Sequence, residues 1–248
     1  MTDVRDVERA TYDTWTPDHR ASIGGWDLYA ADGFTRRINS ATADGTPATD
    51  PETWAAVSNW LVERNAAPIV RVTPLLSPHT VRTIKDVWEY EEIDDSAQFS
   101  APASGDYDDG VRLVDVAEPG FFHDINRLND RRDTSIPAWQ RLLSRVRVRA
   151  AGLWVPGVAV GLVVESRPYA AVYSVAVEPS ERRKGIAGRM MSAAGAWALD
   201  RGADTMILQV YLGNAAATSL YESLGYTERY RYSYLQAAPD SAESIYGC

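Results

Sequence analysis

The chain has 248 residues, of which 45% are hydrophobic and 24% are charged, the usual proportions of a soluble globular protein with a buried core. Its 25 Lys and Arg residues and 34 Asp and Glu residues give a formal net charge of −9. A chain this acidic lacks the broad basic face that binds nucleic-acid phosphates, so we expect no nucleic-acid partner. Its length suits one large domain or two small ones.

Cysteine and histidine usage argues against several kinds of site. The single cysteine, Cys248, is the last residue, which leaves no intrachain disulfide, Cys-rich zinc site or thiol nucleophile to expect. The histidines, His19, His79 and His123, form no ligand-spaced pair, so we expect no metal. The first residues lack the apolar stretch of a signal peptide, and no run is long enough for a membrane helix. We therefore expect a cytoplasmic protein without a membrane partner.

The composition changes between Asp94 and Gly110, where small residues, acids, Pro and Gly replace any apolar period. Such a stretch is typical of an exposed linker. We place the linker at 97–110, between an N-terminal unit at 1–96 and a C-terminal domain at 111–248.

The C-terminal domain begins with patterns typical of strands. β-Branched segments predict strands at Val111–Val116, Val146–Leu153, Val158–Glu165 and Ala170–Val177, the last three forming an antiparallel meander. Two helices are expected between the first two strands, because Ile136-Pro137 interrupts the connection. After Val177 the expected order is a helix from Ile186 to Gly202, a strand at Thr205–Val210, a helix from Asn214 to Leu224, and a closing strand at Tyr226–Leu235.

The N-terminal unit resembles part of the C-terminal domain. Trp60, Arg64 and Ala66 recur 137 residues later as Trp197, Arg201 and Ala203, and Ile69, Val72 and Trp88 recur 138 residues later as Ile207, Val210 and Tyr226. Both copies have the order helix, strand, helix, strand, which favours two related α/β units over the chance likeness of such patterns. In the N-terminal unit, Phe34–Ser40 is expected to be a strand with Arg36 and Arg37 on opposite faces.

The segment Tyr173–Met191 (YSVAVEPSERRKGIAGRMM) predicts an anion site. A strand ends at Val177, and a basic, glycine-containing turn leads directly into a helix. Backbone N–H groups at a helix start have no intrahelical partners and carry partial positive charge, so they bind phosphates. The alternative is a solvated basic turn with no ligand. The glycine spacing does not match a dinucleotide fingerprint, and Lys184 precedes Gly185, unlike a Walker loop.

The order strand, Arg182-x-x-Gly185-x-Ala187, helix, strand and then Asn214-x-x-Ala217-x-x-Leu220-Tyr221-x-x-x-Gly225-Tyr226 resembles the GNAT superfamily of acyl-CoA-dependent N-acyltransferases. The resemblance covers Val111 to about Leu235. It implies a mixed α/β fold and acetyl-CoA, or a close acyl-CoA, as the donor. It also makes the N-terminal unit a degenerate GNAT-like copy, as in tandem members of the family.

The resemblance assigns a role to each matching residue. The loop that holds the CoA pyrophosphate corresponds to Arg182, Arg183, Lys184, Gly185, Ile186, Ala187 and Gly188. The strand that binds the pantetheine arm and acyl carbonyl, by splaying from its parallel neighbour, contributes backbone groups of Val175, Ala176 and Val177. Tyr221 matches the general acid that protonates the departing thiolate, and Asn214 matches a residue that contacts the cofactor arm. Asn214 has the alternative role of a helix cap alone.

The general base does not follow from the resemblance. Several family members place a Glu early in the central strand, where this chain has Ala171. Tyr173, on the same face of the strand, and Glu165, at the end of the preceding strand, are candidates, as is a water chain without a dedicated base.

The N-terminal copy lacks the residues of a cofactor site. Its counterpart of the pyrophosphate loop is Gly45–Pro51 (GTPATDP), and Thr83 stands where the C-terminal copy has Tyr221. We expect the N-terminal unit to help build the acceptor pocket, to which its tryptophans would contribute, unless they are core residues.

The resemblance implies an N-acetyltransferase that moves an acetyl group to a primary amine of a small molecule or peptide, with donor and acceptor bound together. No covalent acyl-enzyme is expected, because no activated nucleophile is visible. The alternatives are a CoA-responsive binding module without transfer activity and a purely structural partner protein. The net charge of −9 mildly favours cationic acceptors. The sequence does not determine the oligomeric state, and a homodimer is one option.

Overall fold

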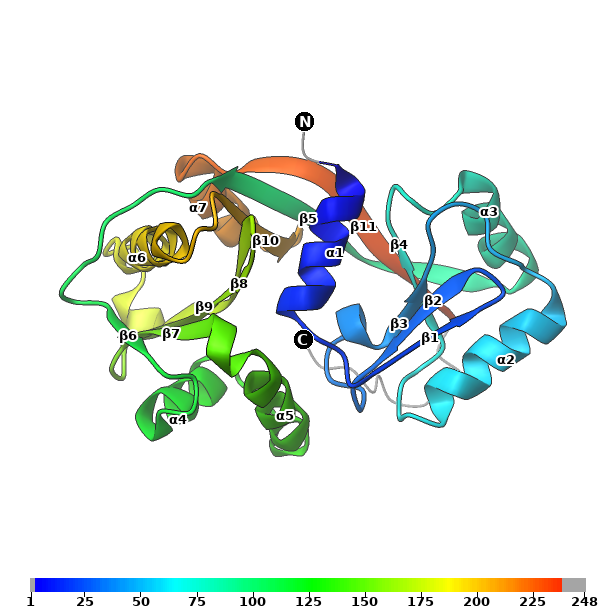
Figure 1. The fold of residues 1–248 in the computed structure, drawn as a ribbon, viewed down its shortest axis with the longest axis horizontal. Coiled ribbons are helices and arrows are strands. Elements are labelled where there is room, and N and C mark those ends of the chain that lie inside the picture. The colour runs from blue at the N-terminus through cyan, green and yellow to red at the C-terminus, as the bar shows by residue number, and fades with distance from the viewer. Residues whose placement is uncertain (1–2, 238–248) are drawn as a thin grey trace. The chain divides into compact units, whose positions relative to one another are not determined.

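A computed structural model describes residues 3–237, which divide into two compact units (Figure 1). Unit 1 contains the described residues 3–16, 98–210 and 214–229, and unit 2 contains the described residues 17–97, 211–213 and 230–237. The long strands β5 (Tyr90–Pro102) and β11 (Thr227–Ala237) each contribute one part to each unit. Cys248 lies outside the described residues.

Unit 1 is built on a mixed sheet. Its strands follow the order β11-β5-β10-β9-β8-β7-β6. The strands introduced here are β6 (Arg112–Val114), β7 (Ala150–Val155), β8 (Ala159–Ser166), β9 (Tyr169–Val177) and β10 (Thr205–Tyr211). Strands β6 to β9 form antiparallel pairs, whereas β9 and β10 run parallel. The parallel pair requires a crossover connection, which a helix supplies.

Helices cover both faces of this sheet. They are α1 (Val4–Thr14), α4 (Pro119–Leu128), α5 (Ile136–Val146), α6 (Ile186–Asp200) and α7 (Ala215–Ser223), with short 3₁₀ turns η2 (Asp133–Ser135), η3 (Arg147–Arg149) and η4 (Pro179–Glu181). The crossover helix α6 lies on one face, and α4 and α5 lie on the other (Figure 1). Met190 of α6 packs against Gly161, and Phe121 of α4 packs against Gly152, which shows that glycines in β7 and β8 let the helices approach closely.

The first helix, α1, belongs to unit 1. The guanidinium of Arg149 donates to the Asp13 carbonyl (2.9 Å), and Arg145 donates to the Thr16 carbonyl (2.9 Å). Cations at the carboxyl end of a helix satisfy its last carbonyls and oppose its dipole. The sequence-based prediction assigned α1 to the N-terminal unit. No pattern within α1 indicates that arginines more than a hundred residues later bind its carboxyl end.

Most expected elements of the C-terminal domain are confirmed. The helix from Ile186 ends at Asp200, and the meander strands match β7, β8 and β9. Two helices occupy the connection between β6 and β7, with Pro137 in the first turn of α5, where proline is favoured. The mixed α/β fold class is confirmed as well.

The stretch 97–110 differs from the expected exposed linker. Residues 97–102 complete strand β5, and residues 96–101 are buried. The following residues lie along α6: Ala103 N–H donates to the Asp204 carbonyl (2.7 Å), Asp106 N–H to Ser192 Oγ (2.9 Å), and the Tyr107 hydroxyl to Asp200 (2.6 Å). The small and polar residues of this stretch are typical of a linker. In the structure they instead allow close packing and form long-range hydrogen bonds.

Unit 2 has a smaller sheet with the strand order β1-β2-β3-β4-β11-β5. Its elements are β1 (His19–Ile23), β2 (Trp26–Ala30), the 3₁₀ turn η1 (Arg36–Ile38), β3 (Ser40–Thr42), α2 (Pro51–Val62), β4 (Ile69–Val72) and α3 (Pro78–Val87). Buried Trp26, Leu28, Val57 and Leu61 join β2 to α2 in its core. The expected order helix, strand, helix, strand is confirmed by α2, β4, α3 and β5.

The expected strand at Phe34–Ser40 is wrong, because η1 occupies its centre. Asn39, fully buried, explains the difference. Its Oδ1 accepts from Ala31 N–H (2.7 Å), and its Nδ2 donates to the Phe34 carbonyl (2.8 Å). These side-chain bonds to backbone groups replace a strand ladder.

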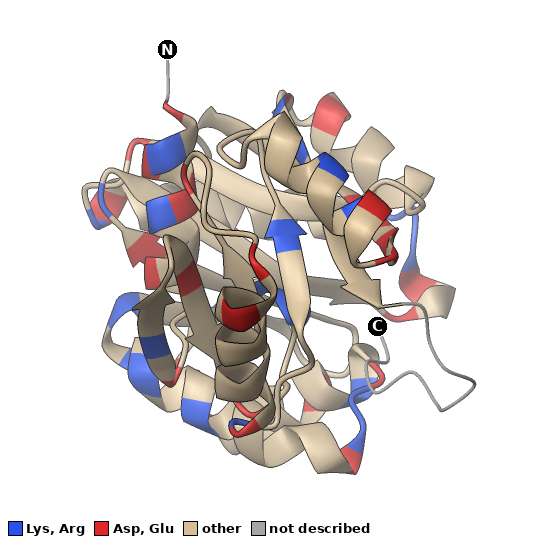
Figure 2. Ribbon diagram, turned by 90° about the vertical axis from the view of Figure 1, so that its right-hand side faces the viewer, with Lys and Arg blue, Asp and Glu red and all other residues tan. Residues whose placement is uncertain are grey.

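Acidic and basic residues are intermixed along the helices and loops that face the viewer in Figure 2. Within unit 2, Lys85 pairs with Glu92 and Arg36 with Asp94. No helix in the described part of the chain is both long and apolar enough to cross a membrane.

Asp124 on α4 makes the stability of unit 1 sensitive to acid. Burial alone would raise the pKa of this carboxyl, but hydrogen bonds from Trp154 Nε1 (2.9 Å) and Gly157 N–H (2.7 Å), together with Arg127, hold its pKa below the usual value. A lowered pKa in the folded state stabilises the fold above the unfolded value, about 3.9, and this stabilisation is lost as the pH falls through the folded pKa. The measurement is the denaturant concentration at the unfolding midpoint, taken from neutral pH down to about pH 3. We expect this midpoint to decrease more for the wild type than for Asp124→Asn. Equal pH dependence of the two proteins would contradict this role.

Candidate active site

The candidate site begins where β9 and β10 separate. Pairing joins Tyr169–Val172 to Thr205–Leu208 and then stops, although β9 continues to Val177 and β10 to Tyr211. On its other edge β9 stays paired with β8 as far as Val177. Peptide groups of an antiparallel strand point alternately to its two sides, so some of those in 174–177 point into the wedge between β9 and β10. The wedge therefore presents backbone hydrogen-bonding groups that β10 does not pair.

A β-bulge marks the start of the wedge. Ser174 and Val175 of β9 face the single residue Gly161 of β8, and Ser174 has a left-handed φ of 53°. A bulge bends its strand and increases the local twist, which turns the end of β9 away from β10. Gly161 suits this position because a Cβ there would lie 3.2 Å from Met190 Cε. Residues 174–177 are partly exposed, in contrast to the buried first half of β9.

The loop after β9 leads into a helix start whose first N–H groups lack intrahelical partners. Arg183 (φ 62°) and Gly185 (φ 76°) are left-handed, and Gly185 precedes the first residue of α6. Arg189 N–H reaches the Gly185 carbonyl (3.1 Å), whereas the amides of residues 186–188 come too early in the helix to find an intrahelical acceptor. Left-handed residues before a helix turn successive N–H groups to one side, which is the geometry of a phosphate site.

The basic side chains of this loop are partly engaged. Arg182 Nε donates to the Val177 carbonyl (3.1 Å), which ties the loop to the end of β9. Lys184 pairs with Glu181 (2.9 Å). The sequence predicted three basic groups at one rim, and the structure uses two of them to brace the loop. The backbone is thus the main expected contact for an anion.

Helix α7 supplies the remaining predicted residues. Asn214 caps the helix, with its Oδ1 accepting from Ala217 N–H (3.1 Å). Both interpretations of Asn214 include this cap, and its contact with the cofactor arm stays a prediction. Burial raises the pKa of Tyr221, whose ring lies 5.9 Å from that of Tyr226. A raised pKa keeps the phenol protonated at neutral pH, which a general acid requires.

The candidates for the general base lie in different places. Ala171 is buried between its strand partners Val164 and Ile207. Glu165 pairs with Ala170, and Ala170 is five residues before Val175 in β9. Glu165 is therefore about 16 Å from Val175 along the strand direction. Tyr173 adjoins the bulge, but its hydroxyl shares a hydrogen bond with Thr14 Oγ1 (2.7 Å). The structure brings Tyr173 to the wedge and leaves Glu165 away from it.

Sequence reasoning named Trp15 only among the N-terminal tryptophans of a possible acceptor pocket, and it missed the other residues around Tyr173. Trp15 packs on its ring (4.3 Å between ring centres), and Trp139 of α5 packs on Trp15 (5.6 Å). Asn129 and Arg131, between α4 and η2, bond to Ser174. No short-range pattern marks these residues, because their neighbours at the site come from other parts of the chain.

The equivalent helix start in unit 2 is occupied by a carboxylate. Asp50 caps α2, accepting from Thr53 N–H (2.9 Å), and this bond lowers the pKa of Asp50. A negative charge thus sits where α6 presents unpaired N–H groups. This arrangement opposes an anion at α2.

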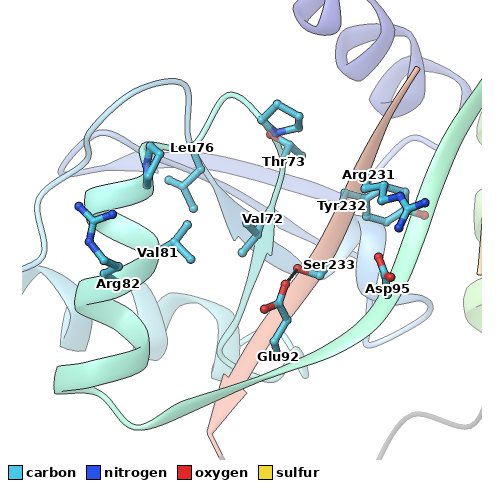
Figure 3. Close-up of a pocket in the computed structure, with 12 residues that line it drawn as sticks. Val72, Thr73, Leu76, Val81, Arg82, Glu92, Asp95, Arg231, Tyr232 and Ser233 are labelled. Atoms are coloured by element: carbon cyan, nitrogen blue, oxygen red, sulfur yellow. Dashed lines mark hydrogen bonds between the residues drawn. The ribbon is translucent and has the colours of Figure 1, made fainter. Parts of the chain in front are cut away.

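Unit 2 also contains a groove of about 490 Å³ beside β4 and α3. Figure 3 shows Val72, Leu76 and Val81 on one side, and Glu92 bonded to Ser233 on the other. The residues predicted for catalysis and cofactor binding all lie in unit 1. The groove is therefore separate from the candidate active site.

Comparison with known proteins identifies the family. Residues 123–226, which contain the wedge, the α6 loop and α7, match the Acetyltransferase (GNAT) family. Over these residues the chain belongs to the GNAT superfamily. Residues 1–101 of this GNAT protein match a second family, described as Probable histone acetyltransferase Rv0428c C-terminal, which agrees with a chain of two units.

The relatives agree with this assignment. An uncharacterized N-acetyltransferase, YobR of Bacillus subtilis, is 24% identical over 92% of this chain and 96% of its own. A mycothiol acetyltransferase of Thermobispora bispora is 48% identical over 61 residues, which are 24% of this chain and 20% of that protein. The fold is shared with the GCN5-related N-acetyltransferase from Kribbella flavida (TM-score 0.68, 16% identity, 96% of this chain and 97% of that one). This GNAT protein is an acyltransferase.

Proposed function

We propose that unit 1 binds acetyl-CoA between β9 and β10 and transfers its acetyl group directly to a primary amine of a small molecule or peptide. The observation that carries the proposal is the end of β9–β10 pairing at Val172 and Leu208, directly before a bulge and an open helix start. The residues fit the ligand: the α6 amides suit its diphosphate, and the unpaired edge of residues 175–177 suits its pantetheine amides and acyl carbonyl. Among the described residues, no group of His, Cys, Asp and Glu could hold a metal, and the proposal requires none.

In the proposed reaction the amine nitrogen attacks the thioester carbon, and the C–S bond breaks as the C–N bond forms. Backbone N–H groups of the β9 edge stabilise the negative charge on the carbonyl oxygen. Tyr221 gives its proton to the departing thiolate, and the proton lost by the amine leaves through Tyr173 or a water chain, because Glu165 lies too far along the strand to reach it. Because donor and acceptor are held together, positioning supplies much of the rate.

The transfer is tested by following release of the CoA thiol from acetyl-CoA in the presence of an amine panel. We expect amine-dependent release. Binding of acetyl-CoA without transfer to any amine would favour the second candidate, a CoA-responsive module, which Ala171 in place of a carboxylate supports.

Gly188→Asp tests where the diphosphate binds. The new carboxylate would stand in the first turn of α6, where it favours the helix but repels an anion. We expect acetyl-CoA to bind roughly 100-fold more weakly by calorimetry, with the melting temperature maintained. Gly188→Ala is the matched control, because its Cβ meets only Leu224 Cδ2, at 3.9 Å, and adds no charge. Wild-type affinity in Gly188→Asp would place the diphosphate elsewhere.

A further inference from the structure

Two side chains from the segment between α4 and η2 converge on the bulge residue Ser174. Asn129 Nδ2 donates to the Ser174 carbonyl (3.3 Å), and Arg131 Nη2 donates to the Ser174 hydroxyl (2.7 Å). Ser174 directly precedes Val175, the first residue expected to face the acyl group. Consecutive Cα atoms are about 3.8 Å apart, so Arg131 bonds to the residue next to the one that is expected to face the acyl group.

Buried aromatic rings fix the position of this guanidinium. Arg131 Cζ lies 4.2 Å from the ring centre of Trp139, which is fully buried. Trp139 packs on Trp15, and Trp15 packs on Tyr173. Contact with an aromatic face stabilises a cation, and the dry side of the site strengthens its interactions with anions.

The charge persists at neutral pH. Burial lowers the pKa of Arg131 to about 10, which still leaves the guanidinium protonated in the physiological range. A guanidinium has five N–H donors in a planar fork whose shape matches a carboxylate, and in Arg131 this fork reaches the bulge at Ser174.

On the basis of the proposed acetyl transfer, we propose that Arg131 determines acceptor specificity by receiving the carboxylate of an amino acid whose amine lies at the wedge. In an α-amino acid the nitrogen and carboxylate are separated by a single carbon. That short separation suits an amine at Val175 and a carboxylate at the guanidinium that is bonded to the preceding residue. The net charge of −9 favours cationic acceptors only at long range, whereas Arg131 acts at the site itself.

Matched acceptor pairs test the proposal. Ala, Phe, Glu and Lys are each compared with the corresponding carboxamide, and kcat/KM is expressed per free amine. We expect the wild type to prefer the carboxylates about tenfold to a hundredfold, as charge-assisted hydrogen bonds provide. Arg131→Met should remove this preference through KM, and Arg131→Lys should retain part of it. Ser174→Ala is the control, because it removes the hydroxyl but keeps the guanidinium, so the preference should remain.

Product binding gives a second readout that does not need turnover. Calorimetry with CoA-loaded protein compares the N-acetyl derivative of each amino acid with its carboxamide, in the wild type and in Arg131→Met. Preference for the carboxylates in the wild type alone supports the proposal. Equal binding of both series, no binding of either, or a preference kept in Arg131→Met would overturn it. Failure of acetyl-CoA itself to bind is measured separately and would instead contradict the proposed function.

Discussion

Replacement of Tyr221 by Phe is expected to lower kcat about 100-fold, the usual contribution of a general acid. The affinity for acetyl-CoA should change little, because the variant removes only a hydroxyl. Burial raises the pKa of Tyr221 and keeps its proton available, and Phe has no proton to give to the thiolate. The measurements are steady-state kinetics with saturating amine and calorimetry with acetyl-CoA.

Tyr226→Phe is the matched control for this variant. Tyr226 is buried beside Tyr221, with ring centres 5.9 Å apart, so the two variants make the same chemical change in one cluster. We expect Tyr226→Phe to keep kcat near the wild-type value. An unchanged kcat in Tyr221→Phe would remove Tyr221 from the acid role, and an equal loss in both variants would make the effect structural.

Gly195→Ala is expected to destabilise the protein by about 3 kcal/mol, the upper part of the usual range for overpacking. A Cβ at Gly195 would lie 1.9 Å from the Ser104 carbonyl oxygen, and a Cβ at Gly105 would lie 2.2 Å from the Ser192 carbonyl oxygen. Both close contacts involve backbone atoms, which have little freedom to shift. The free energy of unfolding from denaturant titration measures the effect.

Gly188→Ala makes the same substitution in the same helix without the clash. Its Cβ makes only an ordinary contact with Leu224 Cδ2 at 3.9 Å, and alanine favours a helix over glycine by roughly 0.5–1 kcal/mol, so this variant should be neutral or slightly more stable. Equal stabilities of Gly195→Ala and the wild type would show that residues 103–107 are not packed tightly on α6.

The parts of the fold with local signals were predictable. Capping residues, proline at helix starts and the change of apolar period locate α5, α6, α7 and β7 to β10. The chemistry of the loop from Arg182 to Gly188 follows from the same signals, since a glycine-containing turn before a helix has a specific backbone requirement. The GNAT resemblance rests on these residues, and the family match confirms it.

The parts that depend on distant contacts were not predictable. Gln98 is fully buried in β5 because its amide donates to the Leu208 carbonyl (3.0 Å), although a polar residue in a Ser- and Ala-rich stretch suggests a linker. The membership of α1 in unit 1 depends in the same way on Arg145 and Arg149. Arg131 and Ser174 are 43 residues apart, so their contact has no signature in the sequence.

The most direct test of the account is a crystal structure with acetyl-CoA bound. We predict that the diphosphate accepts hydrogen bonds from the amides of residues 186–188 and that the thioester lies between β9 and β10, with Tyr221 Oη near its sulfur. A ligand bound instead at unit 2, or a wedge closed by β9–β10 hydrogen bonds beyond Val172, would contradict the central claim.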